Sequence, residues 1–275
     1  MDMILLHITT GFLYALASVF VWRRIIGKKR QDKAERDNRR SVYFLPAFAI
    51  FLHFVITQDY AFKIDGLHLG IGNIVSFVVL AICVTYAIYG LKTGSYSLLA
   101  ICLPVGLVAS ALPILDSGLT RPIDANLFIF KTHLSLSIIA YSMFSVAFIH
   151  TLLIGFIEQS IQRHRLSAFV EEAPPLLELE RLMFYITLFG FIVLSLALGT
   201  GIIFSFELQN NAFSWNHKTI FSITSWCMFA TLLLGRKYFG WRGKTARKLL
   251  TTSFSLLLLS YLGTRFVSEV LLQST

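Results

Sequence analysis

The fold class of this chain is decided by one stretch, Phe213-Ser-Trp-Asn-His-Lys-Thr-Ile-Phe-Ser-Ile-Thr-Ser-Trp226, which continues to Gly235-Arg-Lys-Tyr-Phe-Gly-Trp-Arg-Gly243. It begins as a polar, aromatic loop, enters an apolar run from Thr219 to Leu234, and ends in a basic cluster. An aromatic belt at one end and positive charge at the other are typical of a helix that crosses a bilayer in a fixed orientation. We therefore predict a transmembrane helix here, and we expect any chemistry in the aromatic loop.

The composition extends this interpretation to the whole chain. Of its 275 residues, 56% are apolar and only 14% are charged, and the mean hydropathy is +0.70. A soluble domain carries about a quarter charged residues, so the composition predicts a polytopic membrane protein. The net charge is +9, but the basic residues gather in loops beside apolar segments. That distribution indicates membrane orientation rather than nucleic-acid binding, and we expect no nucleic-acid partner.

Eight apolar segments follow one another along the chain, at 4–24, 42–58, 70–89, 96–115, 126–157, 181–206, 218–235 and 247–270. Most are long enough to cross about 30 Å of hydrocarbon as a helix. The fifth is longer than one crossing requires, so we expect it to tilt or to project beyond the membrane. The pattern predicts an all-α protein, a bundle of about eight transmembrane helices that forms a single transmembrane domain over residues 1–275.

The basic residues in the loops predict the orientation of the bundle. Nineteen of the 24 Lys and Arg residues lie in the loops after the first, third, fifth and seventh segments. Because cytoplasmic loops carry the excess of positive charge, these odd loops are predicted to be cytoplasmic and both termini external. Within the fifth loop, Pro174-Pro175 followed by acidic residues predicts the start of a helix.

The seven histidines carry the functional signal. The predicted orientation puts five of them in the outer half or at the external surface: His7, His53, His68, His133 and His217. Taken alone, each is best interpreted as a structural or interfacial residue, but polar groups at membrane depth are costly, and a group of five indicates a site. Neighbouring aromatic residues favour a flat apolar ligand such as haem. Asp59 and Asp65 leave a divalent metal site as an alternative, and an interfacial aromatic belt is a further one.

Other chemistries find little support in the sequence. It contains no Ser/His/Asp arrangement, no paired membrane carboxylates and no Gly-rich loop that would cradle a phosphate, so we assign no catalytic residues. Gly199-Thr-Gly201 is interpreted as a patch of small residues that packs against another helix. A metal-ion permease is disfavoured because the predicted spans contain almost no carboxylates.

The C-terminal half shares the order and spacing of its motifs with a known family. Phe130-Lys-Thr-His-Leu-Ser-Leu-Ser-Ile-Ile-Ala-Tyr141 has a histidine near its start and continues through small residues to a tyrosine. Leu177-Glu-Leu-Glu-Arg-Leu182 precedes the next span, and Phe213-Ser-Trp-Asn-His-Lys-Thr219 lies where the family has the motif Trp-Ser-Trp-Asp-Pro-Lys-Glu. Trp226, Arg236 and Gly240-Trp-Arg-Gly243 follow in the same order. Residues 126–270 thus resemble the cytochrome c assembly family, the haem-handling membrane proteins of the CcsA/ResC type.

The chain departs from the family pattern at the tryptophan motif and near its end. Phe213, Asn216 and His217 replace the first Trp, the Asp and the Pro of that motif. The second external histidine of the family is absent from Gly263-Thr-Arg-Phe-Val-Ser268. These departures make the chain more similar to the divergent HemX/YpjD-like branch than to an enzyme that attaches haem.

The resemblance implies a haem-binding protein of a bacterial inner membrane, accessory to cytochrome c maturation and partnered there by another membrane protein. The residues expected to hold haem are His133 and His217 as axial ligands of the iron, Trp215 and Phe213 as walls of the porphyrin, and Lys218 or Arg121 as the partner of a propionate. His53 is a candidate ligand for a second, buried site. The alternative is a non-catalytic accessory subunit of a transporter or envelope complex in which the haem site has decayed, as the degraded tryptophan motif indicates.

Overall fold

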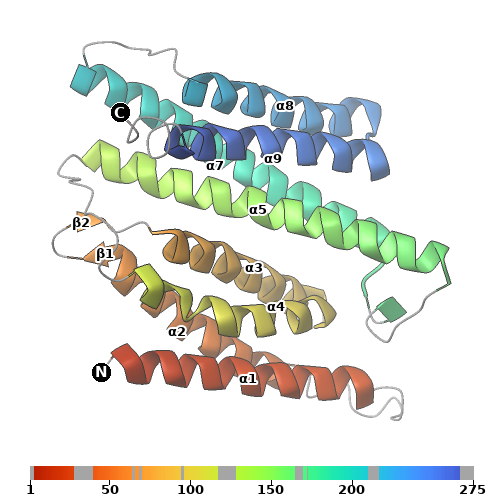
Figure 1. The fold of residues 1–275 in the computed structure, drawn as a ribbon. Coiled ribbons are helices and arrows are strands. Elements are labelled where there is room, and N and C mark those ends of the chain that lie inside the picture. The colour runs from red at the N-terminus through yellow and green to blue at the C-terminus, as the bar shows by residue number, and fades with distance from the viewer. Residues whose placement is uncertain are drawn as a thin grey trace. The chain divides into compact units, whose positions relative to one another are not determined.

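The computed structural model describes residues 3–27, 40–63, 66–67, 70–93, 96–116, 128–164, 170–171, 173–209 and 217–266. Backbone contacts divide the chain into two compact units. Unit 1 comprises Met1–Asp124 with Ile157–Pro175, and unit 2 comprises Ala125–Phe156 with Leu176–Thr275. Both units consist of long helices (Figure 1), which confirms the predicted helical membrane fold. The prediction of a single domain over residues 1–275 stays a prediction, and each unit is described by itself.

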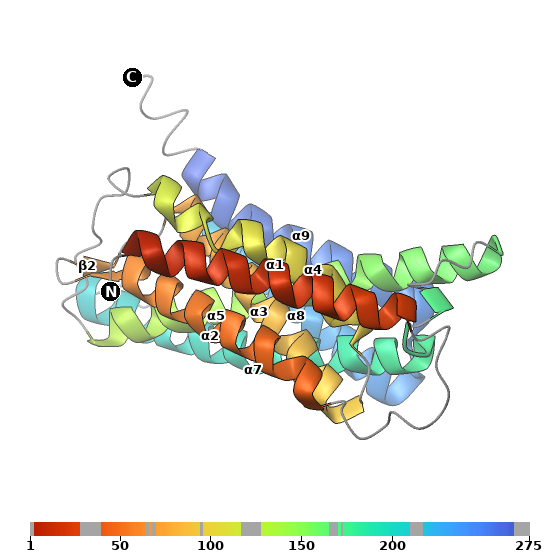
Figure 2. The ribbon, with the colours of Figure 1, turned by 90° about the horizontal axis from the view of Figure 1, so that it is seen from below.

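Unit 1 contains four long helices: α1 (Met3–Gly27), α2 (Phe44–Ala61), α3 (Ile71–Thr93) and α4 (Ser97–Ala109). Short 3-10 turns, η3 (Arg40–Tyr43) and η4 (Leu112–Asp116), precede α2 and follow α4. Two-residue strands, β1 (Phe62–Lys63) and β2 (Gly66–Leu67), pair antiparallel after α2, with Phe62 opposite Leu67. Figure 2 shows α1 and α2 side by side along most of their length.

Unit 2 is built from α5 (Phe128–Gln162, of which the part up to Phe156 belongs here), α7 (Leu176–Gln209), α8 (His217–Phe239) and α9 (Gly243–Phe266). The start of α7 agrees with the sequence, because it follows Pro174-Pro175 directly and has Glu178 in its first turn. An acid in that position is stabilised by the partial positive charge of the helix N-terminus. A three-residue turn connects α8 to α9.

Seven of the described helices are long and apolar enough to cross a membrane, over Met3–Ile25, Phe44–Ala61, Gly72–Thr93, Ser97–Leu115, Ile129–Gln162, Leu176–Ile203 and Lys218–Phe239. They confirm the first seven predicted segments. The eighth segment is helical as α9 but is not among these seven; it begins with Lys244, Arg247 and Lys248 and contains several Ser and Thr residues. The eighth crossing therefore stays a prediction.

The helices turn large apolar side chains outward as well as inward. Ile4 and Phe44, for example, are 75% and 77% exposed in unit 1. Such faces suit contact with lipid chains, whereas packing and hydrogen bonds hold helices together inside a bilayer. In unit 2 the fully buried rings of Phe144 on α5 and Phe229 on α8 stack with centroids 3.8 Å apart. This stack joins two helices that are distant in the sequence.

Candidate functional site

His133 lies in the second turn of α5 and is held in one orientation by α7. Its Nδ1 is 2.8 Å from the backbone oxygen of Ala197, and the side chain is half-buried. A carbonyl oxygen can only accept, so Nδ1 carries the proton and Nε2 of the neutral ring keeps the lone pair. Metal-binding histidines commonly donate their other ring N–H to a carbonyl or carboxylate in this way. His133 is therefore in the tautomer that could bind a metal through Nε2.

Gly201 leaves the space that the His133 ring occupies. A Cβ added at Gly201 would lie 2.9 Å from His133 Cε1 and 3.1 Å from Nδ1, whereas a Cβ at Gly199 would meet nothing within 4 Å. The two glycines therefore differ, although the sequence predicted one packing patch for both. Gly201, one turn after Ala197, lets the imidazole approach the backbone of α7.

The backbone of His217 lies at the same level of unit 2 as His133. The helices α5 and α8 run in the same direction, because each is antiparallel to α7. Along α5, His133 lies against Gly201 and the later residue Phe144 lies against the earlier residue Gly190. Along α8, Trp226 contacts Ser195, and the later residue Arg236 contacts the earlier residue Phe184. His133 precedes Phe144 by 11 residues and His217 precedes Phe229 by 12, and these two phenylalanines stack on each other. At 1.5 Å per residue the two histidines differ in level by about 2 Å. The His217 side chain lies outside the described residues.

Lys218 is exposed in the first turn of α8, next to His217. Its backbone oxygen accepts a hydrogen bond of 3.0 Å from the Ser260 hydroxyl, and Ser260 also contacts the Ser222 hydroxyl at 2.7 Å. These bonds tie the start of α8 to α9, and the Lys218 side chain is exposed. Phe213 and Trp215, which precede α8, and Arg121, which precedes α5 in the sequence, lie outside the described residues.

Trp226 forms an aromatic contact deeper in unit 2 than His133. Its indole N–H donates to Ser195 Oγ at 2.8 Å, and its ring stacks on Phe191 with centroids 5.3 Å apart. Ser195 precedes Gly201 by six residues on α7, which is about 9 Å along the helix. Sequence reasoning named Trp226 but missed Ser195 and Ala197, whose partners become visible only in the packed helices.

His53, the candidate for a second site, lies in unit 1 with both ring nitrogens engaged. It is fully buried, with Nδ1 3.0 Å from the Tyr14 hydroxyl and Nε2 2.8 Å from Ser76 Oγ. A role as metal ligand would require one of these hydrogen bonds to break. That role stays a prediction.

A second histidine of unit 1 forms a similar contact between α1 and α2. His7 Nδ1 donates to the Ser110 backbone oxygen at 2.9 Å, and Nε2 is 3.3 Å from the Tyr60 hydroxyl. On each helix the histidine precedes the tyrosine by seven residues, and the helices are antiparallel, so His7 pairs with Tyr60 while Tyr14 pairs with His53. Both ring pairs meet edge to face, with centroids 5.5 and 5.7 Å apart.

The described part of the chain contains no group of three or more His, Cys, Asp or Glu side chains that could hold a metal ion. His68 and Asp65 lie outside that part, so the predicted metal alternative is not tested at their positions. His150, which the predicted orientation puts in the cytoplasmic half of the protein, is buried, and its Nε2 donates to the Leu179 backbone oxygen at 2.9 Å. His150 follows His133 by 17 residues on α5, about 25 Å, so they cannot share a site.

Comparison with known proteins identifies the family of this chain. The model of the family described as "Cytochrome C assembly protein" matches residues 37–272. The chain is 30% identical over 210 residues to the "Inner membrane protein YpjD" of Escherichia coli K12, which covers 75% of this chain and 78% of that protein. It is also 34% identical over 90 residues to the "Cytochrome c biogenesis protein CcsA" of Prochlorococcus marinus MIT 9215, which covers 33% of this chain and 29% of that protein.

A third relative, the "Uncharacterized 28.8 kDa protein in nifR3-like 5'region" of Azospirillum brasilense, is 26% identical over 262 residues, 93% of each chain. The seven apolar helices and the similarity to an inner membrane protein support a multi-pass inner membrane protein embedded in the lipid bilayer. Both the family match and the extended similarity cover most of the sequence. The chain therefore belongs to the cytochrome c assembly protein family, as a divergent, YpjD-like member.

Proposed function

We propose that this protein binds haem at the end of unit 2 that carries His133 and His217, and that it handles haem as an accessory to cytochrome c maturation. The observation that carries the proposal is the hydrogen bond from His133 Nδ1 to the Ala197 oxygen. It leaves Nε2 as the ring nitrogen with a lone pair, which is the donor that a haem iron accepts as an axial ligand.

The neighbouring residues have complementary roles in this proposal. Gly201 gives His133 the room to stand against α7, and His217 supplies the second axial imidazole from the start of α8. Lys218 is exposed beside it and suits a propionate, because a carboxylate is stabilised by a charge-assisted hydrogen bond from an ammonium group. Trp215 and Phe213 complete the proposed site as the sequence predicts them, and Arg121 is the sequence-predicted alternative to Lys218 for a propionate. When bound, haem would supply the redox-active iron, while these residues bind and orient it.

The family supports a place in cytochrome c assembly, and the degraded tryptophan motif supports an accessory role. His217 stands where the family motif has proline, so this chain brings its own candidate ligand into a loop that has lost other motif residues. The alternative is an accessory subunit of a transporter or envelope complex without haem. The two functions differ in one property that can be measured directly, the presence of bound haem.

The test is the visible spectrum of the full chain purified from haem-replete cells. We expect a sharp Soret band in the wild type, its loss in the double variant His133→Ala/His217→Ala, and partial recovery of the single variants with added imidazole, which can fill the vacated position. His164→Ala is the matched control, since His164 is exposed in the turn that follows α5. A wild-type protein without Soret absorbance, or loss of haem in His164→Ala alone, would contradict the proposal.

A further inference from the structure

The turn between α8 and α9, Gly240–Arg242, is built as a fixed structure. Gly240 and Gly243 have φ angles of 65° and 61°, which side chains other than glycine rarely adopt. The Trp241 N–H donates to the Gly235 oxygen at 3.2 Å, and its indole ring covers Gly235 so closely that a Cβ there would overlap it. The turn therefore has a defined shape rather than being a loose connection.

Around this turn the acidic side chain is buried, whereas most of the basic side chains are exposed. Glu180 is only 9% exposed, and its Oε1 accepts the Gly243 N–H at 2.8 Å. Arg236 also points inward, because it donates to the Trp241 oxygen at 3.4 Å and lies 4.7 Å from the centre of the Phe184 ring. Four other basic side chains are exposed: Lys237, Arg242, Lys244 and Lys248. The outer surface of the turn is thus positive, while its acidic group faces inward.

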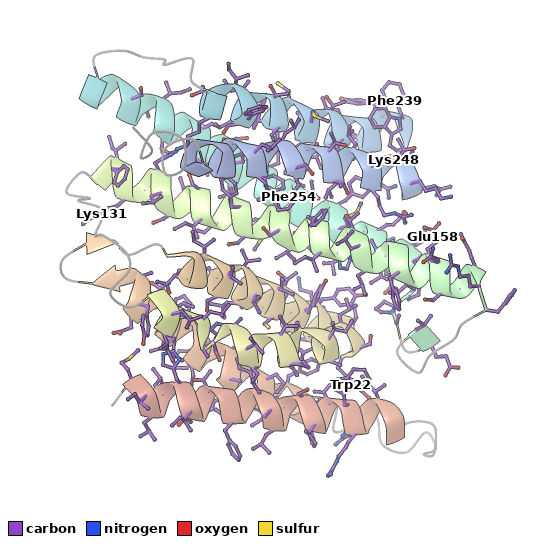
Figure 3. The ribbon with its side chains drawn as sticks, viewed as in Figure 1. Trp22, Lys131, Glu158, Phe239, Lys248 and Phe254 are labelled. Carbon is purple, nitrogen blue, oxygen red and sulfur yellow. The ribbon has the colours of Figure 1, made fainter. Side chains whose placement is uncertain are left out.

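Large apolar side chains stand directly beside these cations. Tyr238 and Phe239 are 69% and 76% exposed, and Leu234, one turn earlier on α8, is 54% exposed. The candidate membrane span of α8 ends at Phe239, so these rings lie where a helix leaves the hydrocarbon. Figure 3 shows Phe239 and Lys248 at the same end of unit 2, with Lys131 at the opposite end. A ligand for this surface would need a negative group next to an apolar tail.

We propose that the surface formed by Lys237, Arg242, Lys244 and Lys248 binds the headgroup of an anionic phospholipid, whose acyl chains lie against Leu234 and Phe239. Basic residues beside a membrane-spanning helix attract anionic headgroups, with each contributing about a fivefold increase in affinity near the membrane surface. A free phosphate would match the cations but not the exposed apolar side chains. An acidic protein segment would likewise leave Leu234 and Phe239 without a partner in the membrane.

The test compares binding of phosphatidylglycerol and phosphatidylcholine to the full chain in uncharged detergent, by native mass spectrometry. The variant Arg242→Gln/Lys244→Gln removes two charges from the surface, and Lys92→Gln/Lys131→Gln is the matched control that removes two exposed charges elsewhere. The charge-conserving variant Arg242→Lys/Lys244→Arg reports whether charge alone is needed. We expect the preference for phosphatidylglycerol to fall about 25-fold in the first variant, fivefold for each charge removed, and to change less than twofold in the other two.

Each result decides the proposal. No preference for phosphatidylglycerol in the wild type, or an equal loss in the turn variant and in the Lys92/Lys131 control, would overturn it. Displacement of bound phosphatidylglycerol by equimolar glycerol phosphate would show that the surface recognises phosphate without the lipid, and would also overturn it. Size-exclusion elution of each variant as a single peak confirms folding before the lipids are compared. The outcome is independent of haem, since apoprotein can be used throughout.

Discussion

A single methyl group at Gly201 should weaken haem binding, whereas the same methyl group two residues earlier should not. In Gly201→Ala the new Cβ would stand 2.9 Å from His133 Cε1, and ordinary contact begins near 3.4 Å. The ring must therefore retreat by about 0.5 Å, which lengthens the 2.8 Å bond to the Ala197 oxygen beyond the usual range for N–H···O hydrogen bonds.

The size of the effect follows from that hydrogen bond. A bond of this kind contributes about 1 kcal/mol, which corresponds to about fivefold in affinity. We thus expect haem to bind about fivefold more weakly to Gly201→Ala. Gly199→Ala is the matched control, because its Cβ meets nothing within 4 Å. Replacement of glycine by alanine inside a helix gains roughly 0.5–1 kcal/mol of stability, so the control should unfold at a higher temperature than the wild type.

Two measurements check this reasoning: titration of the apoprotein with haem, followed at the Soret band, and thermal unfolding of the apoprotein. The second does not depend on haem, so it tests the contact between Gly201 and His133 separately from the proposed function. Haem affinities that agree within twofold between the two variants would refute the role of Gly201. Equal gains in unfolding temperature would refute the contact itself.

Three further predictions concern orientation and buried hydrogen bonds. Reporter fusions at positions 35 and 275 should report opposite sides of the membrane, with position 35 cytoplasmic; two cytoplasmic signals would eliminate α9 as an eighth crossing. Tyr14→Phe should lower the free energy of unfolding by about 1–3 kcal/mol, because it leaves His53 Nδ1 buried without its partner, and a denaturant titration that finds no change would contradict this. Trp226→Phe should keep the stack on Phe191 but lose the hydrogen bond to Ser195, which should lower the free energy of unfolding by about 1 kcal/mol. If the same substitution lowers it equally in a Ser195→Ala background, the hydrogen bond is not the cause.

The helices of this protein could be predicted from the sequence because hydropathy reports them directly. The predicted segment 126–157 corresponds to α5, whose extra length was expected, and Pro174-Pro175 correctly marks the start of α7. The sequence of α9 fits two interpretations, because Lys244, Arg247 and Lys248 at its start give it the composition of an amphipathic helix as much as of a membrane span. Composition cannot decide between these two where basic and apolar residues share one helix.

The partners of the candidate site residues could not be predicted in the same way. Hydropathy identifies His133 as a polar group in an apolar helix, but not the Ala197 carbonyl that fixes its tautomer, since backbone oxygens carry no sequence signal. The sequence predicts that five histidines lie on the external side of the membrane and that they form one group. Those that the structure describes have separate partners, with His7 bonded to Ser110, His53 to Tyr14 and His133 to Ala197. Which residue meets which depends on helix rotation, and that is set by packing.

The paired histidines and tyrosines of α1 and α2 have a consequence for biosynthesis. All four residues of the two pairs are contained in the first 61 residues, so both pairs can form as soon as α2 has been translated. Ser76 and Ser110 are added only later, by α3 and the segment after α4. A polar side chain that enters hydrocarbon alone is costly, whereas one that enters already bonded is less so. The first two helices should therefore leave the translocon together, as a hairpin whose polar groups are matched before the rest of unit 1 exists.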